Sequence, residues 1–272
     1  MAVRAGALYR EKAYTCGEYK DVYIYPVYPA RQNQSGRRRR RRPTREVQKK
    51  LNQRHAREKF ARLLHANFTS RDLSVGLSYA IDPESRDVAM KDLQKFLRRL
   101  RYRYRKLGIE LKYLWQMEIS SKGRYHFHVV LSGGMDRDEI EQLWGHGYAN
   151  TKRLQPEYAG LAPLSGYISK SHHREEETRL TYRSYNGSKN LVDPPPKVSD
   201  TKIGSRKRAA ELADEDWNLW NRLYPGYELV DIHPFHSDEY GSVYIFARLR
   251  RTPGGSPDGA HGKKTRGGGS QA

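Results

Sequence analysis

Apolar and polar residues alternate in several short stretches of the middle of the chain, and a stretch of helical spacing separates them. Residues 73–81 alternate, which predicts a strand with one buried face. Residues 93–107 place apolar side chains three or four positions apart and end at Gly108, which predicts a helix closed by a glycine. Residues 111–119 and 124–131 alternate again on either side of a polar turn. These two stretches predict a β-hairpin.

The order of the elements predicts the fold class. A helix over 136–144 and a strand over 147–154 are expected after the hairpin, so the order is strand, helix, strand, strand, helix, strand. This is the split βαβ pattern of a ferredoxin-like or RRM-like α+β fold with an antiparallel sheet. Because its crossovers share one hand, both helices are expected on one sheet face. The other face is expected to be open and to hold the active site.

Weaker patterns predict the elements outside this core. A short edge strand is expected over Val22–Tyr25, close to two prolines. Thr44 is the expected N-cap of a basic amphipathic helix that runs to about Asn67. The remaining predictions are helices over 163–173 and 208–223 and closing strands over 227–231 and 242–249.

Shifts in composition predict the domain organisation. We expect a basic N-terminal arm with its helix over 1–70, one endonuclease-sized domain over 71–250, and a disordered Gly-rich tail over 251–272. Residues 174–205 are polar and proline-rich, and the sequence assigns them no role.

Charge is concentrated near the N-terminus. The 272 residues carry a net charge of +20, and residues 37–62 alone contain thirteen Lys or Arg and two Glu. Such a block predicts contacts with nucleic-acid phosphates through counterion release. A solubilising run and an import-type address are the alternatives. The expected DNA-binding residues are Arg37, Arg38, Arg39, Arg40, Arg41, Arg42, Lys152 and Arg153.

The apolar residues and the single cysteine exclude other classes of protein. No run approaches the roughly 20 apolar residues of a membrane span, and the first ten residues lack the apolar segment of a signal peptide. Cys16 is the only cysteine, which excludes an intramolecular disulfide and a thiolate zinc cluster. A cytoplasmic protein is therefore expected, and its metal ligands would be histidine and carboxylate.

The polar side chains of the hairpin share one face. Odd positions of both strands are apolar and suit the core, whereas even positions carry Glu118, His126 and His128. With the turn centred on Lys122, Glu118 lies directly opposite His126. Two histidines and a carboxylate predict a three-ligand metal site with open positions. The alternative is an ordinary polar strand face exposed to solvent. The even positions of the first strand are small: Ser74, Gly76, Ser78 and Ala80.

Tyr167 and Lys170 follow the histidines in a predicted helix. They are three residues apart and so share a helix face. A tyrosine hydroxyl is a poor nucleophile unless a cation stabilises its phenolate, and a metal with a lysine can do so. The alternative is that Tyr167 only packs.

Together these residues resemble a known family. His126-Phe127-His128, preceded by Glu118 and followed by Tyr167-x-x-Lys170, resembles the single-tyrosine HUH endonucleases, specifically the rolling-circle replication initiators of small single-stranded DNA phages and plasmids. Relaxases of that superfamily place the tyrosine before the histidines, so this order resembles the replication type. The resemblance implies that Glu118, His126 and His128 bind Mg²⁺ or Mn²⁺, that Tyr167 is the nucleophile, and that Lys170 assists it.

The resemblance also implies an activity and partners. The expected reaction nicks single-stranded DNA at an origin and leaves a 5′-phosphotyrosyl intermediate and a free 3′-hydroxyl, with later strand rejoining. Expected partners are the DNA origin, a host helicase and a DNA polymerase, in the host bacterial cytoplasm if a phage encodes the chain, and no membrane. The alternatives are a non-enzymatic nucleic-acid-binding protein with an RRM-like sheet and a transposase of the same superfamily.

Overall fold

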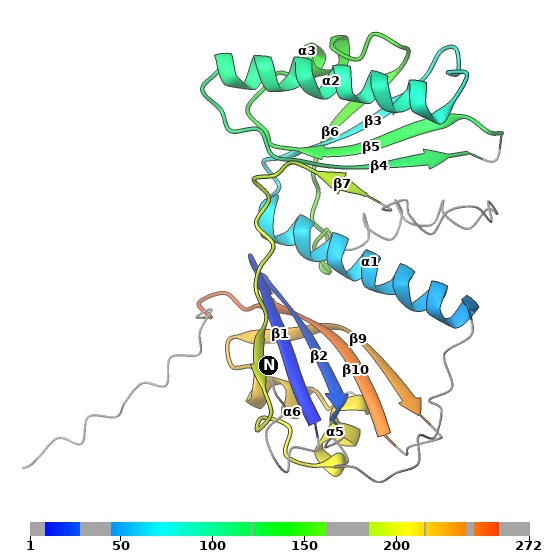
Figure 1. Ribbon diagram of the computed structural model, residues 1–272. Helices are drawn as coiled ribbons and strands as arrows, with labels where there is room; N and C mark the ends of the chain where they lie inside the picture. The colour runs from blue at the N-terminus through cyan, green and yellow to red at the C-terminus, as the bar shows by residue number, and fades with distance from the viewer. Residues whose placement is uncertain are drawn as a thin grey trace, which may run out of the picture. The chain divides into compact units, whose positions relative to one another are not determined.

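The chain forms two units rather than the single domain predicted over 71–250. The computed structural model describes residues 9–27, 45–120, 122–161, 185–214, 216–237 and 242–255, with the side chains of 45–51 left out (Figure 1). Contacts group residues 31–195 into one unit, here called the inner unit, and residues 1–30 with 196–272 into a second, the outer unit. The division differs from the predicted one because an N-terminal strand pairs with a C-terminal strand.

The inner unit is built on an antiparallel sheet of strand order β6-β3-β5-β4-β7. Its first four strands in the chain take the spatial order fourth, first, third, second, which is the ferredoxin-like arrangement and confirms the predicted α+β class. The strands are β3 (Leu73–Ser78), β4 (Tyr113–Ile119), β5 (Tyr125–Leu131), β6 (Ala149–Arg153) and β7 (Asn186–Gly187).

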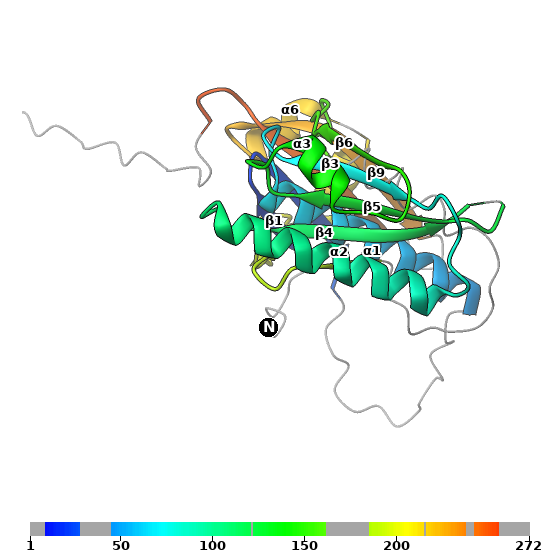
Figure 2. The same cartoon turned by 90° about the horizontal axis from the view of Figure 1, so that it is seen from above.

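Helices α2 (Arg86–Lys106) and α3 (Arg137–Gln142) lie on one face of this sheet (Figures 1 and 2). The side chain of Ser85 accepts a hydrogen bond from the Val88 amide and begins α2. Apolar residues of the helices then pack against the odd-numbered strand residues, as the alternation predicted. Fully buried members of this core are Leu93, Phe96, Leu100, Phe127, Val129, Leu131, Ile140 and Trp144.

The opposite face of the sheet is not open along its whole length. Helix α1 (Arg45–Asn67) packs there, and its Phe60 and Leu64 contact a cluster that contains Leu114 and Val130 of the sheet (Figure 1). The prediction of an uncovered face is therefore wrong at this end, because even positions of β4 and β5 are apolar here and match the apolar stripe of α1. The helix span is confirmed, whereas its expected cap, Thr44, lies outside the described residues.

The outer unit has a second antiparallel sheet, of order β8-β1-β2-β10-β9. Strand β2 pairs with β1 on one side and with β10 on the other, so the predicted edge strand over Val22–Tyr25 is wrong and the segment is central. The strands are β1 (Tyr9–Cys16), β2 (Tyr19–Pro26), β8 (Lys197–Ser199), β9 (Tyr227–Ser237) and β10 (Ser242–Arg251).

Two short helices, α5 (Arg206–Ala213) and α6 (Trp217–Leu223), cover one face of the outer sheet. One continuous helix over 208–223 was predicted. It is interrupted because the Asp216 carboxylate accepts a hydrogen bond from the Leu219 amide and begins a new helix. The Trp220 indole then donates to the Leu212 carbonyl at 3.1 Å, which joins the two helices.

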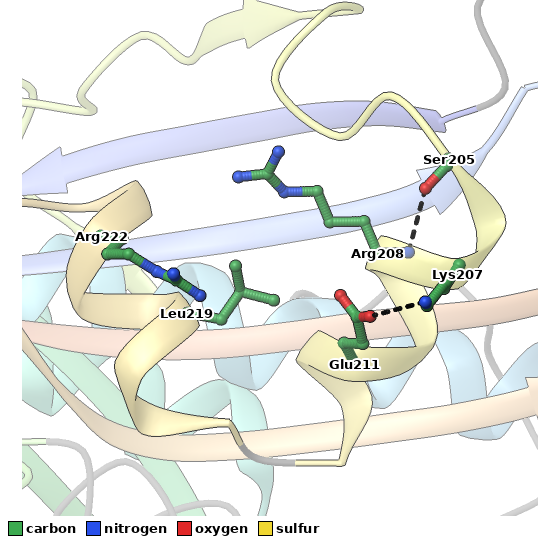
Figure 3. A pocket seen from close by; sticks show the side chains of 6 residues that line it. All are labelled: Ser205, Lys207, Arg208, Glu211, Leu219 and Arg222. Atoms are coloured by element: carbon green, nitrogen blue, oxygen red, sulfur yellow. Dashed lines mark hydrogen bonds and ion pairs between the residues drawn. The ribbon is translucent and has the colours of Figure 1, made fainter.

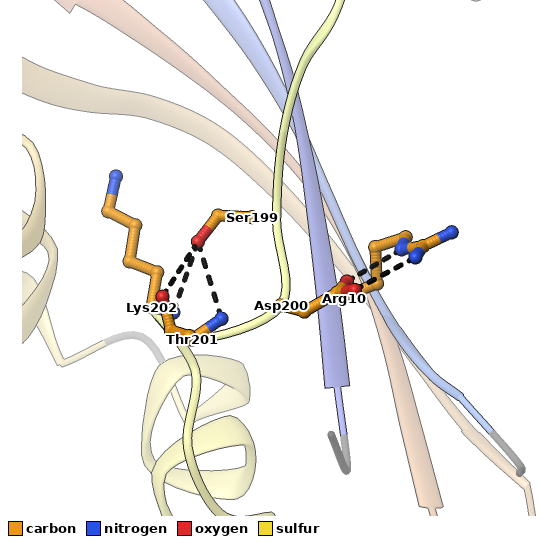
Figure 4. A network of polar contacts seen from close by, with 5 residues as sticks. All are labelled: Arg10, Ser199, Asp200, Thr201 and Lys202. Carbon is orange, nitrogen blue, oxygen red and sulfur yellow. Dashed lines mark hydrogen bonds and ion pairs between the residues drawn. The ribbon is translucent and has the colours of Figure 1, made fainter. Parts of the chain in front are cut away.

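Buried polar groups support the outer unit. Arg10 donates to both carboxylate oxygens of Asp200 at 2.7 and 2.9 Å, and this links β1 to the segment after β8 (Figure 4). The Ser199 hydroxyl accepts hydrogen bonds from the amides of Thr201 and Lys202 and fixes the turn between them. The charged Glu11 of β1, only 4% exposed, accepts from Lys202 and from a tyrosine that follows α6. A buried glutamate breaks the apolar alternation of β1, and for that reason the pattern did not reveal the strand.

Candidate functional site

The β4–β5 hairpin places the predicted site residues in the register expected from the sequence. Gly123 adopts a φ of +77°, in the left-handed region that favours glycine, and its amide donates to the Ser120 carbonyl at 2.9 Å. This turn fixes the pairing of the two strands. Glu118 lies opposite His126, and His128 lies opposite Gln116, which confirms the predicted cross-strand pairs.

A diagonal contact joins the two strands on this face. Nε2 of His128 lies 2.8 Å from Oε2 of Glu118, which is a hydrogen-bond distance. The two side chains are 24% and 28% exposed, so a ligand can reach them from solvent. The neighbouring Gln116 is only 3% exposed and lies beneath this surface. The pair thus stands at the border between the buried and the open parts of the face.

The strand beside the histidines carries little side-chain bulk. In β3, Gly76 pairs with His128, and Ser78 pairs with His126. On the far side of β3, Gly76 pairs with the exposed Asn150 of β6. Tyr148, which precedes β6, is 74% exposed. The open part of the face therefore combines a carboxylate, imidazoles, an amide and an exposed aromatic ring around small residues.

The described residues do not complete a metal site by themselves. Across the described ranges, no group of three or more His, Cys, Asp or Glu side chains is arranged to hold a metal ion. Glu118 and His128 are in contact, and His126 shares their face as the direct partner of Glu118. A three-ligand site at these residues stays a prediction.

The other predicted site residues have mixed outcomes. Lys152 is exposed on β6 opposite Ser74, and Arg153 donates to the Arg71 carbonyl at 3.3 Å at the end of the same strand. Several predictions lie outside the described residues: Tyr167, Lys170, the helix over 163–173 and the arginines Arg37, Arg38, Arg39, Arg40, Arg41 and Arg42.

Sequence reasoning missed a polar cluster on the side of the sheet that α2 covers. The carboxylate of Asp92, 6% exposed, lies 3.2 Å from the Lys95 ammonium and 3.6 Å from Nε2 of His146. Burial, and then the negative charge of Asp92, raise the pKa of Tyr79 above its ordinary value, so this phenol stays protonated. The partners come from separate elements of the fold, and no local pattern indicates their contact.

A shallow depression on the outer unit lies between α5 and α6 (Figure 3). Lys207 and Glu211 form a loose ion pair there at 4.0 Å, and the Ser205 hydroxyl accepts from the Arg208 amide and caps α5. The lining residues are Ser205, Lys207, Arg208, Glu211, Leu219 and Arg222. Their polar groups already serve the helix and one another, and the arrangement offers no catalytic set.

Comparison with known proteins bears on the inner unit. Residues 72–172 match a family of replication-associated proteins, described as replication-associated protein ORF2. The match spans β3 to β6 as well as Tyr167 and Lys170. The matched segment is well under half of the chain and supports a role in replication. Comparisons with curated proteins and with solved structures gave no match. Among the described helices, none is long and apolar enough to cross a bilayer.

Proposed function

We propose that this chain is a replication initiator that nicks single-stranded DNA at an origin through a metal-assisted tyrosine. The carrying observation is the hairpin register. It sets Glu118, His126 and His128 on one sheet face, within the segment that matches the replication-associated family. A solvent-exposed strand face with unrelated polar residues would have no reason to bring a carboxylate to 2.8 Å from an imidazole.

The residues present suit a divalent cation. Neighbouring ligands of an octahedral ion with bonds of about 2.1 Å are roughly 3 Å apart. The 2.8 Å between Glu118 Oε2 and His128 Nε2 is close to that separation, so both atoms can bind one Mg²⁺ or Mn²⁺ after a small outward movement. His126 would be the third ligand. Such a cation would polarise a non-bridging oxygen of the scissile phosphate.

The proposed nucleophile is Tyr167, with Lys170 stabilising its phenolate. The phenolate oxygen forms a bond to phosphorus, the bond from phosphorus to the 3′-oxygen breaks, and that oxygen takes up a proton. The products are a 5′-phosphotyrosyl enzyme and a free 3′-hydroxyl that can prime synthesis. Because the phosphodiester is exchanged rather than hydrolysed, the same site can later rejoin strands without a new energy source.

Basic residues would hold the substrate. Lys152 and Arg153 are exposed at one end of β6, and with the run Arg37–Arg42 they would contact phosphates without reading sequence. In this proposal the partners are a single-stranded DNA origin, a host helicase and a DNA polymerase. The protein would act in the cytoplasm, which is that of the host bacterium if a phage encodes the chain.

The test uses end-labelled single-stranded oligonucleotides tiled across the DNA that encodes the chain, incubated with Mn²⁺ and run on a denaturing gel. The wild-type protein is expected to give a covalent protein–DNA band and a shortened strand. Tyr167→Phe is expected to abolish the band and to leave binding of the same oligonucleotide nearly unchanged. Tyr102→Phe, an exposed tyrosine of α2, is the matched control and is expected to keep the band.

Other outcomes would contradict the proposal. A folded wild-type protein that binds the oligonucleotides and never yields a band would favour the non-enzymatic RRM-like binder. A band that persists in Tyr167→Phe would assign the nucleophile to another residue. Parallel loss of binding and band in that variant would show that Tyr167 is structural.

A further inference from the structure

Gly76 occupies an unusual place for a glycine. It lies in the middle of β3, a central strand that pairs with β5 on one side and with β6 on the other. Glycine is unfavourable inside a strand because it loses more backbone freedom than other residues on folding and provides no side chain to pack. β-Branched residues are the favoured choice at such a position. The glycine therefore needs a reason beyond strand formation.

The described residues provide no such reason. A Cβ added at Gly76 would have none of their atoms within 4 Å, and its backbone does not take up the left-handed conformation. Two other glycines of the inner unit differ. A Cβ at Gly133 would collide with the Arg71 carbonyl, and one at Gly187 would come to 2.5 Å from Leu191. Crowding requires glycine at those two positions and does not require it at Gly76.

The surroundings of Gly76 are those of a binding surface. His128 and Asn150 are its cross-strand partners, one on each side, and they share its sheet face. Ser78, the next residue of this face along β3, is also small. The exposed Tyr148 lies beside it, because the Tyr148 amide donates to the Ser78 carbonyl at 3.0 Å. The lowest point of this face thus lies directly beside the Glu118–His128 pair.

We propose that Gly76 is a positioning residue that lets one nucleotide of the single-stranded DNA approach the sheet backbone beside His128. The proposal rests on the proposed function and deepens it. A nucleotide in van der Waals contact with the backbone lies roughly 3.5 to 4 Å above it. A side chain at this position would occupy that layer and lift the nucleotide, and with it the phosphate, away from Glu118 and His128. Tyr148 is suitably placed to stack on the same nucleotide or its neighbour.

The variants Gly76→Ala and Gly76→Val test this proposal. Gly204→Val is the matched control, because Gly204 lies before α5 in the outer unit and a Cβ there would also meet no described atom within 4 Å. Gly76→Val is expected to unfold at the wild-type temperature or above it, since valine favours a strand. Its binding of a fluorescein-labelled oligodeoxythymidine is expected to weaken about tenfold, with a smaller loss for alanine and none for Gly204→Val.

Covalent adduct formation gives the second readout. A displacement of about 1 Å can slow a reaction on the order of a hundredfold, so Gly76→Val is expected to form adduct far more slowly than the wild type. A scan of single abasic sites through the cleaved oligonucleotide is expected to find one position that restores the rate of Gly76→Val and does not accelerate the wild type.

The outcomes separate this proposal from the proposed function. Wild-type binding and adduct formation in Gly76→Val would overturn the role of Gly76 and leave the nicking activity standing. If the wild type binds oligodeoxythymidine without forming adduct, the nicking function fails, and the binding loss in Gly76→Val still decides the proposal. An unfolded valine variant transfers the decision to Gly76→Ala, whose unchanged binding would also overturn it.

Discussion

The two sheets of this protein differ most on the faces that their paired helices leave uncovered. Both are five-stranded and antiparallel, with two helices against one face. On its second face the outer sheet is filled by aromatic rings: Tyr23 lies 5.9 Å from Tyr14 and 5.2 Å from Phe246, and His233 stacks on Phe246 at 6.0 Å. The corresponding part of the inner sheet has glycine and serine beside its histidines.

Their ion pairs differ in the same way. Arg248 and Asp21 of the outer sheet form two hydrogen bonds of 2.7 and 3.0 Å, with side chains only 4% and 1% exposed. The Glu118–His128 pair of the inner sheet is about a quarter exposed. A buried two-bond pair is committed to holding strands together, whereas a partly exposed pair can exchange its partner for a ligand. The comparison assigns structure to the outer face and chemistry to the inner one.

The largest expected effect is on stability in the outer unit. Asp21→Ala would leave the Arg248 charge buried without its partner, which costs about 3 to 5 kcal/mol. The carboxylate of Asp21 helps to keep the pKa of Arg248 above its ordinary value, so the guanidinium stays charged at any working pH. Denaturant unfolding followed by the fluorescence of the buried Trp220 measures the loss. Glu118→Gln is the control and is expected to change stability by less than about 1 kcal/mol. Equal losses in both variants would remove the contrast between the two pairs.

The second effect is on metal dependence in the inner unit. His128→Ala removes a proposed ligand and is expected to weaken the apparent Mn²⁺ affinity by about 10- to 100-fold in the adduct assay. His233→Ala removes a histidine from the outer face and is expected to leave the Mn²⁺ titration unchanged. The titration must be run on variants with wild-type unfolding curves. A shift in His233→Ala as large as that in His128→Ala would contradict the division of roles.

The smallest effect is a pH dependence of the outer unit. The hydrogen bond from His233, at 3.0 Å, lowers the pKa of Asp231 below its ordinary value of 3.8. A carboxylate with a lowered folded-state pKa contributes stability above its unfolded-state pKa and loses that contribution as pH falls through the folded value. The difference in unfolding free energy between the wild type and His233→Ala is therefore expected to shrink below pH 3.8. Because both groups are substantially exposed, the whole effect should stay under about 1 kcal/mol. A difference that grows on acidification would reverse the assigned sign.

Local signals explain which parts of the structure were predictable. The hairpin register follows from alternation and from one glycine turn, so the pairing of Glu118 with His126 could be predicted from neighbouring residues. The pairing of β2 with β10 joins distant parts of the chain, and no pattern within β2 indicates it. The packing of Phe60 and Leu64 on the inner sheet is similar, because an apolar stripe shows that a helix is covered and does not show by what.

The pairing of β2 with β10 also has a consequence for synthesis of the chain on the ribosome. The β1–β2 hairpin emerges first, yet the strand that completes its neighbourhood is made only after the whole inner unit, a delay on the order of ten seconds. During that interval one side of β2 has unsatisfied amide and carbonyl groups, which are a template for sticking to other nascent chains. A protein truncated after residue 195 would keep this exposed border permanently, and its solubility would be governed by the abandoned hairpin rather than by the intact unit between.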